Sequence, residues 1–134
     1  MGLILILCSS AGCNSTTAPT NYTIVSPVTE IFQGTLAVKG TSFFTFIIGN
    51  PDPLRITLAS LTNESTGAAV TTNVQLGLGV KAGTTCTSTF STTTTAALVA
   101  QYFQVATPGT YCVFVSDPGT MTTSLKFAVR IIHS

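Results

Sequence analysis

The chain has 134 residues, the length of one ordinary domain. Charged residues make up only 7% of it, against roughly 25% in typical globular proteins, and threonine is abundant in their place. A neutral, Thr-rich exterior suits a β-sandwich that faces the outside of a cell and argues against a cytosolic helical enzyme. The net charge is +1, and the few basic residues are scattered: Lys39, Arg55, Lys81, Lys126 and Arg130. With no basic cluster to neutralise phosphates, we expect no binding to nucleic acid.

Residues 1–13 have the features of a targeting segment. Residues 3–7 are an unbroken apolar run, far shorter than the about 20 residues that cross a bilayer. Ala11 and Gly12 then precede Cys13, as before the lipid-accepting cysteine of a bacterial lipoprotein, although a basic segment is missing and Ser10 stands where leucine is usual. We predict lipidation of Cys13. A plain secretory leader and a short apolar stretch that packs on the domain are the alternatives.

Residues 14–21 form a polar, Pro-containing segment that is typical of a tether between a membrane and a domain. The domain itself is predicted over residues 22–134. Within it the apolar residues recur with a period of two, which indicates half-buried strands. Strands are expected over residues 30–38, 42–48, 54–61, 74–80 and 98–105.

The expected strand over residues 74–80 has the clearest apolar stripe, formed by Val74, Leu76, Leu78 and Val80. Gly77 and Gly79 alternate with this stripe. They would leave the opposite face bare, so that another backbone or side chain could approach closely there.

Cys86 and Cys112 are the only cysteines outside the leader. A single pair in a small exported domain indicates a disulfide. A metal or redox site would need further ligands or a C-x-x-C spacing, and neither is present. Cys86 opens a Ser/Thr-rich stretch, residues 86–95, that we expect to be a loop.

The last third of the chain has the strongest strand pattern. Tyr111, Val113 and Val115 alternate on one face, and Asp117-Pro118-Gly119 is a turn signal. A final strand follows, with Leu125, Phe127, Val129 and Ile131 inward and Lys126 and Arg130 outward. We expect the two strands to pair as a hairpin. The whole pattern predicts an all-β, two-sheet antiparallel sandwich, jelly-roll-like, of about seven to eight strands.

The run Gly-Thr-Tyr-Cys-Val-Phe-Val at residues 109–115, followed by a turn and an alternating strand, resembles the end of bacterial prepeptidase C-terminal (PPC-type) domains. Residues 34–36, 43–46 and 54–58 fall where the opening strands of that family would lie. The resemblance covers residues 30–132 and implies a small jelly-roll-like sandwich of an exported protein. It implies a fold and a location, not a reaction.

Groups that could carry chemistry are few. His133 lies one residue from the end, where a mobile surface position is expected. The carboxylates are Glu30, Asp52, Glu64 and Asp117, and those of Asp52 and Asp117 have a sufficient role in hydrogen-bonding the backbone of Pro-containing turns. A calcium site would require Asn50, Asp52 and Asp117 to meet at one end of the sandwich. We therefore predict no catalytic site, no metal site and no cofactor.

The remaining surface feature is a set of apolar residues opposite the expected core faces: Phe43, Ile47, Phe114 and Ile132. If their strands are neighbours, these residues form a contact patch. The first functional hypothesis is thus a non-catalytic exported module, tethered through Cys13 or secreted, that contacts a protein or polysaccharide at a bacterial cell surface. The second is a self-associating structural protein of the envelope or a filament. A hydrolase ranks last.

Overall fold

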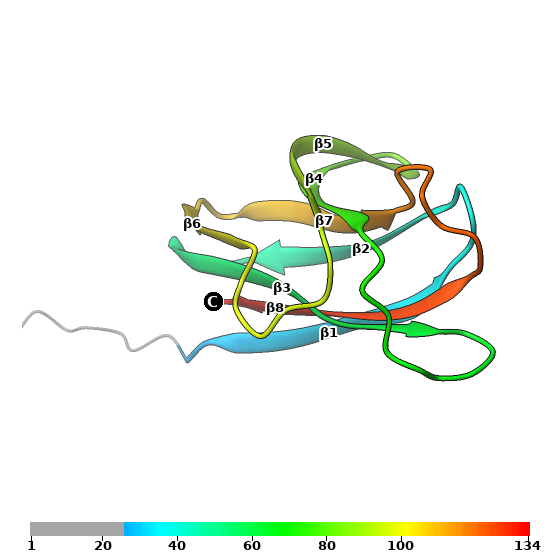
Figure 1. Cartoon of the computed structure of the whole chain (residues 1–134). Helices are drawn as coiled ribbons and strands as arrows, with labels where there is room; N and C mark the ends of the chain where they lie inside the picture. The colour runs from blue at the N-terminus through cyan, green and yellow to red at the C-terminus, as the bar shows by residue number, and fades with distance from the viewer. Residues whose placement is uncertain (1–25) are drawn as a thin grey trace, which may run out of the picture.

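The computed structural model describes residues 26–134, which form eight strands in two four-stranded antiparallel sheets. The strands are β1 (Val28–Leu36), β2 (Thr41–Ile48), β3 (Asp52–Asn63), β4 (Val74–Ala82), β5 (Thr85–Thr94), β6 (Tyr102–Ala106), β7 (Gly109–Ser116) and β8 (Leu125–His133). One sheet has the order β1-β8-β3-β6 and the other β2-β7-β4-β5, and the two face each other as a β-sandwich (Figure 1). The predicted fold class is confirmed. The predicted leader and tether, with Cys13, lie outside the described residues.

The core between the sheets follows from the period-two pattern, because successive side chains of a strand point to opposite faces. Most inward side chains of the interior strands are at most 3% exposed, as in Leu54, Ile56 and Leu58 of β3. The expected stripe of β4 is buried from Val74 to Leu78, whereas Val80 is 47% exposed. The inward faces assigned from the sequence to the last two strands, β7 and β8, are correct, since Val113, Val115 and the four apolar residues named in β8 are at most 3% exposed.

An aromatic pair joins the two sheets between β1 and β2, and a second pair lies within one sheet. Phe32 of β1 stacks on Phe44 of β2, with 5.5 Å between ring centroids, and meets Phe127 of β8 edge-on at 4.9 Å. Such pairs contribute about 0.5–1.5 kcal/mol each beyond the area that they bury. They hold β2, an edge strand, against the opposite sheet.

The predicted hairpin of the last two strands is wrong. β7 pairs with β2 and β4, whereas β8 pairs with β1 and β3, so the connection after β7 crosses from one sheet to the other. Val113 and Val129 do share the core, but from opposite sheets. The alternation of apolar residues fixes which face is buried and carries no information on which strand lies alongside.

The bounds of two strands, β5 and β6, also differ from those expected. Residues 86–95, expected as a loop, lie almost entirely within the edge strand β5, where β-branched threonine suits a half-exposed sheet. Only Phe90 and a few smaller side chains of β5 are partly buried, which is why an apolar stripe is missing from its sequence. Residues 98–101 are not strand, and β6 begins at Tyr102.

The side chain of Asp117 holds the segment between β7 and β8 in place through hydrogen bonds. Its Oδ1 accepts hydrogen bonds from the backbone N–H groups of Gly119, Thr120 and Met121, and its Oδ2 accepts one from the N–H of Lys39 at 2.8 Å. The bond from Lys39, together with those from the turn, lowers the pKa of the Asp117 carboxyl. The expected role of this side chain in bonding nearby backbone is confirmed.

Replacing Asp117 with asparagine should lower the thermal midpoint at neutral pH, because the new NH₂ group would face the N–H of Lys39. A carboxyl with a lowered folded-state pKa stabilises the fold above its unfolded pKa, about 3.9, and loses that effect as the pH falls through the folded-state pKa. The difference between wild type and Asp117→Asn should thus shrink in acid. Melting curves from pH 7 down to acid measure it, with exposed Glu64→Gln as the control. A difference that is constant with pH would contradict this role.

Candidate functional site

A groove with a volume of about 650 Å³ lies on the outer face of sheet β2-β7-β4-β5. This volume is within the range of about 300–1,000 Å³ that small-molecule sites occupy. The groove is open to solvent, and all four strands of the sheet, with the turn between β4 and β5, contribute to it. Its lining comprises Thr41, Phe43, Gln75, Thr84, Thr85, Cys86, Ser88, Ser91, Phe114 and Ser116.

The floor of the groove depends on Gly77. Phe114 of β7 is paired with both Phe43 of β2 and Gly77 of β4. The Phe114 ring lies over Gly77 so closely that an added Cβ would meet the ring carbons at 2.0 Å. Phe114 is consequently only 8% exposed, while Phe43 beside it is 38% exposed. The bare glycine face expected from the sequence is confirmed, and a phenylalanine occupies it.

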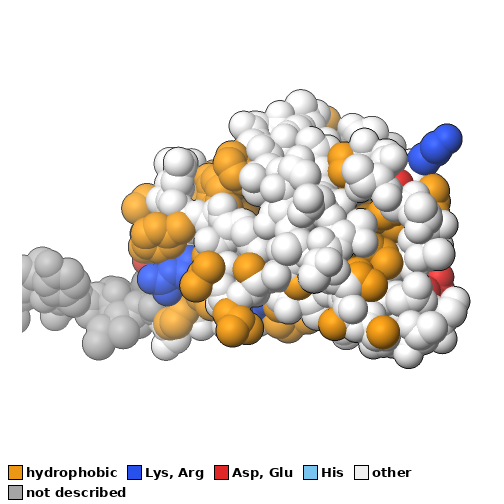
Figure 2. Space-filling view, viewed as in Figure 1, with side chains coloured by type: hydrophobic (Ala, Val, Ile, Leu, Met, Phe, Trp, Pro, Cys, Tyr) orange, Lys and Arg blue, Asp and Glu red, His pale blue; other side chains and the backbone are white. Residues whose placement is uncertain are grey.

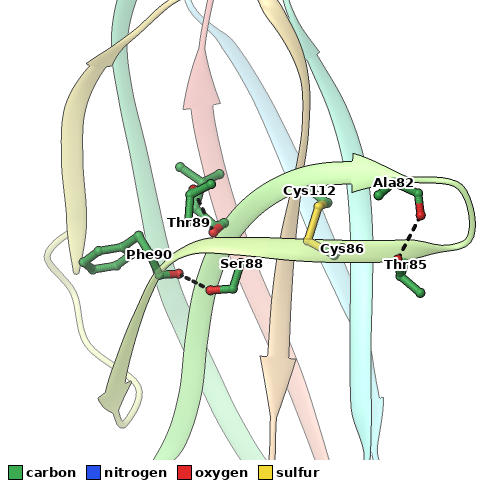
Figure 3. Close-up of a disulfide and its surroundings, with 8 residues drawn as sticks. Ala82, Thr85, Cys86, Ser88, Thr89, Phe90 and Cys112 are labelled. Atoms are coloured by element: carbon green, nitrogen blue, oxygen red, sulfur yellow. Dashed lines mark hydrogen bonds between the residues drawn. A yellow bond between two sulfur atoms is a disulfide. The ribbon is translucent and has the colours of Figure 1, made fainter.

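The wall on the β5 side is held by a disulfide. Cys86 and Cys112 are bonded, as the sequence predicts, with 5.9 Å between their Cα atoms, and join the start of β5 to β7 (Figure 3). β5 also bends tightly over β4, since a Cβ on Gly79 would meet the carbonyl oxygen of Thr87 at 2.2 Å. The hydroxyl of Thr85 donates to the carbonyl of Ala82 at 2.8 Å and closes the turn. This wall is therefore fixed before any ligand arrives.

A short hydrogen-bond chain crosses the groove from β7 to β5. The hydroxyl of Ser116 donates to Oε1 of Gln75 at 3.0 Å, and Nε2 of Gln75 donates to the hydroxyl of Ser91 at 3.3 Å. Both bonds fix the orientation of the amide. One N–H of Gln75 and the proton of the Ser91 hydroxyl remain to donate, and lone pairs of Ser116 remain to accept.

The four residues of the predicted contact patch do not form one surface. Phe43 and Phe114 lie together in the groove, and Ile47 lies further along the same face of β2, 68% exposed. Ile132 is in β8 of the other sheet, beside Thr29 and Arg55, so it does not join them. Gln75, Ser91 and Ser116 were not singled out from the sequence, because single polar residues in a Ser/Thr-rich chain carry no distinguishing signal.

Charge is nearly absent from the groove. Among residues 26–134, none of the side chains that line it is charged, and Cys86 does not titrate because it is in the disulfide. The space-filling view shows how little of the visible surface belongs to charged groups and how much to polar uncharged side chains and backbone (Figure 2). A ligand of this groove meets rings, hydroxyls and one amide.

The ionisable residues lie elsewhere. His133 is 3% exposed, so the expectation of a mobile surface histidine is wrong: its Nε2 lies 2.8 Å from Oε1 of Glu30, and its ring packs on Phe46. The N–H of Gly49 donates to the carbonyl of Ser134, which fixes the chain end. The His133 side chain is buried, the Glu30 side chain is 29% exposed, and neither residue lines the groove.

No three His, Cys, Asp or Glu side chains within residues 26–134 are grouped to hold a metal ion. Asp52 begins β3, just after the end of β2, while Asp117 bonds to residues before the start of β2. An eight-residue strand spans roughly 25 Å, so these carboxylates cannot share an ion.

A second exposed apolar region lies on the other sheet, around β6. Phe103 and Val105 are 57% and 71% exposed, and the guanidinium of Arg55 lies over the Phe103 ring, 5.0 Å from its centroid. Arg55 is paired with both Phe103 and Ile132. A cationic guanidinium therefore packs on the exposed ring of this region.

No protein-family model matches the chain, and no curated protein matches it in sequence. The resemblance to PPC-type domains thus stays a prediction. In the part of the chain that the structure describes, no helix has the length and apolarity needed to cross a membrane.

Proposed function

We propose that the chain is a non-catalytic, exported module, tethered to a bacterial envelope through Cys13, and that it binds a cell-surface component through the groove. The groove itself carries the proposal: it is preformed, uncharged and lined by two aromatic rings beside a row of hydroxyl and amide groups. Concave sites with apolar walls and a few fixed polar groups are where proteins hold ligands.

The same lining supports binding without turnover. General acid–base or nucleophilic chemistry needs ionisable side chains within hydrogen-bond reach of the ligand, and the described lining offers only neutral hydroxyls and an amide. Neither the carboxylates nor the histidine of residues 26–134 are among the residues that line the groove, and Asp117 and His133 are hydrogen-bonded elsewhere. The residues that line the groove can therefore bind and hold a ligand.

The test is retention of the full chain on envelope fractions of the source cells at physiological and at high salt. Wild type should bind equally in both, because the contacts do not depend on charge. Phe43→Ala should abolish the retention, since Phe43 is the most open ring of the groove. Ile31→Ala, which truncates a 54% exposed side chain on the other sheet, is the matched control and should bind like wild type.

Retention that is lost at high salt, or that survives Phe43→Ala, would contradict the proposal. So would a reproducible turnover of a hydrolase substrate that disappears in Glu30→Gln or His133→Gln while the fold remains intact.

A second candidate function is self-association, which the edges of sheet β2-β7-β4-β5 favour. β2 and β5 are both long edge strands without a charged residue or a proline, the features that usually prevent edge-to-edge pairing. One observation argues against self-association. The hydroxyl of Ser88 donates to the carbonyl of Phe90 within β5, so this carbonyl already has a partner. Light scattering over a range of concentrations distinguishes the two: a mass that grows with concentration favours assembly, and a constant monomer mass favours the binding module.

A further inference from the structure

The groove has two chemically different sides. Phe43 and Phe114, from β2 and β7, provide an aromatic side, and Ser88, Ser91 and the β4–β5 turn provide a hydroxyl side. Gln75 lies between them with its amide held by Ser116 and Ser91. A ligand that fits must present an apolar surface to the rings and hydroxyl or amide groups to the opposite side.

The neutrality of the lining restricts the ligand further. A charged ligand would lose hydration on entering and would find no opposite charge among the described lining residues. Anionic and cationic polymers are therefore poor occupants. An uncharged ligand loses little hydration free energy. Its hydroxyls can replace their hydrogen bonds to water with hydrogen bonds to the hydroxyls and the amide of the groove.

A peptide fits less well than a sugar chain. The groove lies on the face of the sheet, where the interior strands β7 and β4 already use their backbone groups in ladders on both sides, rather than along the free edge of β2 or β5. Extended peptides gain affinity by adding to a free strand edge, where backbone groups are available. On this face the N–H and C=O groups of a peptide would be left largely unpaired.

A pyranose ring matches both sides at once. One face is a surface of C–H bonds that packs on an aromatic ring, and its rim carries hydroxyls that donate and accept hydrogen bonds. Because the groove is open and its β5 wall is fixed by the Cys86–Cys112 disulfide, a chain can lie along it without ordering the protein first. Resting on the proposed function, we infer that the ligand is an uncharged polysaccharide, with a sugar ring on Phe43 and its hydroxyls on Gln75 and Ser91.

The experiment measures native-gel retardation of the full chain by dextran, xyloglucan, mixed-linkage β-glucan and neutral mannan, with polygalacturonate and chitosan as charged probes. A neutral polysaccharide should retard wild type, and the charged probes should not. Phe43→Ala should weaken the interaction about tenfold or more, as expected for a central aromatic contact, and Gln75→Met should weaken it as well. Ile47→Ala is the matched control, since Ile47 is on the same strand and face but outside the groove.

Envelope fractions from the source cells separate this inference from the proposed function. Retention that is destroyed by periodate oxidation of vicinal diols and survives protease treatment supports a polysaccharide ligand. Retention that depends on Phe43 but is destroyed by protease and survives periodate overturns the polysaccharide inference and leaves the binding module standing. Retardation by the charged probes alone, or equal retardation of wild type and Phe43→Ala, also overturns the inference. Circular dichroism melts establish that each variant is folded.

Discussion

Val113→Asp should yield a chain with no cooperative unfolding transition. Val113 is 0% exposed in the middle of β7, which is paired on both sides by β2 and β4. A carboxylate there has no partner in the core, and the effective penalty for burying an unpaired charge is several kcal/mol. Since a whole domain is stable by only about 5–15 kcal/mol, this change removes most of that margin or all of it.

Circular dichroism and urea titration measure the outcome of Val113→Asp. Thr110→Asp introduces the same charge at an exposed position of the same strand and should unfold cooperatively near the wild-type midpoint. A cooperative Val113→Asp variant with wild-type stability would mean that β7 turns its other face to the core.

Removing the disulfide should lower the free energy of unfolding by about 3.5 kcal/mol, because the unfolded chain regains the freedom of a loop that joins residues 26 positions apart. The double variant Cys86→Ala/Cys112→Ala avoids burying a hydroxyl where Cys112 is fully enclosed. Urea unfolding measures the loss, and wild type reduced with dithiothreitol should behave like the double variant.

The same bond predicts a labelling result. When the unreduced protein is unfolded and alkylated, mass spectrometry should find neither Cys86 nor Cys112 modified. Modification of both, or a double variant as stable as the oxidised protein, would contradict a disulfide with this role.

The features that were predictable from sequence are those that depend on the alternation of residues along one strand. The buried stripe of β8 and the glycine face of β4 are local patterns, and the structure has them. The disulfide was predictable because only two cysteines remain after the leader. In each case the physical cause, the two-residue period of a strand or the chemistry of a thiol pair, is visible within a short stretch of chain.

What was not predictable depends on partners that are distant in sequence. The signal Asp117-Pro118-Gly119 marks a change of direction, and the same signal serves a hairpin or a crossover between sheets. The burial of His133 requires Glu30, which is 103 positions away. The groove is formed by residues of β2, β4, β5 and β7 together. The sequence of any one of these strands therefore does not indicate it. Phe43 and Phe114 were recognised as exposed apolar residues, and only the sheet order explains why Ile132 does not join them.

The positions of β7 and β8 have a consequence for how the chain acquires its structure. These last two strands of residues 26–134 are both interior strands, since β8 lies between β1 and β3, and β7 lies between β2 and β4 (Figure 1). Before β7 emerges, only the β3–β6 and β4–β5 pairings of the described strands can form, and two isolated pairs of strands are marginal in water. Sheets built from such distant segments close slowly. A chain that passes head first through a narrow pore would therefore stay largely unpaired until β7 is released, and would complete the sheet β2-β7-β4-β5 before β8 completes the other.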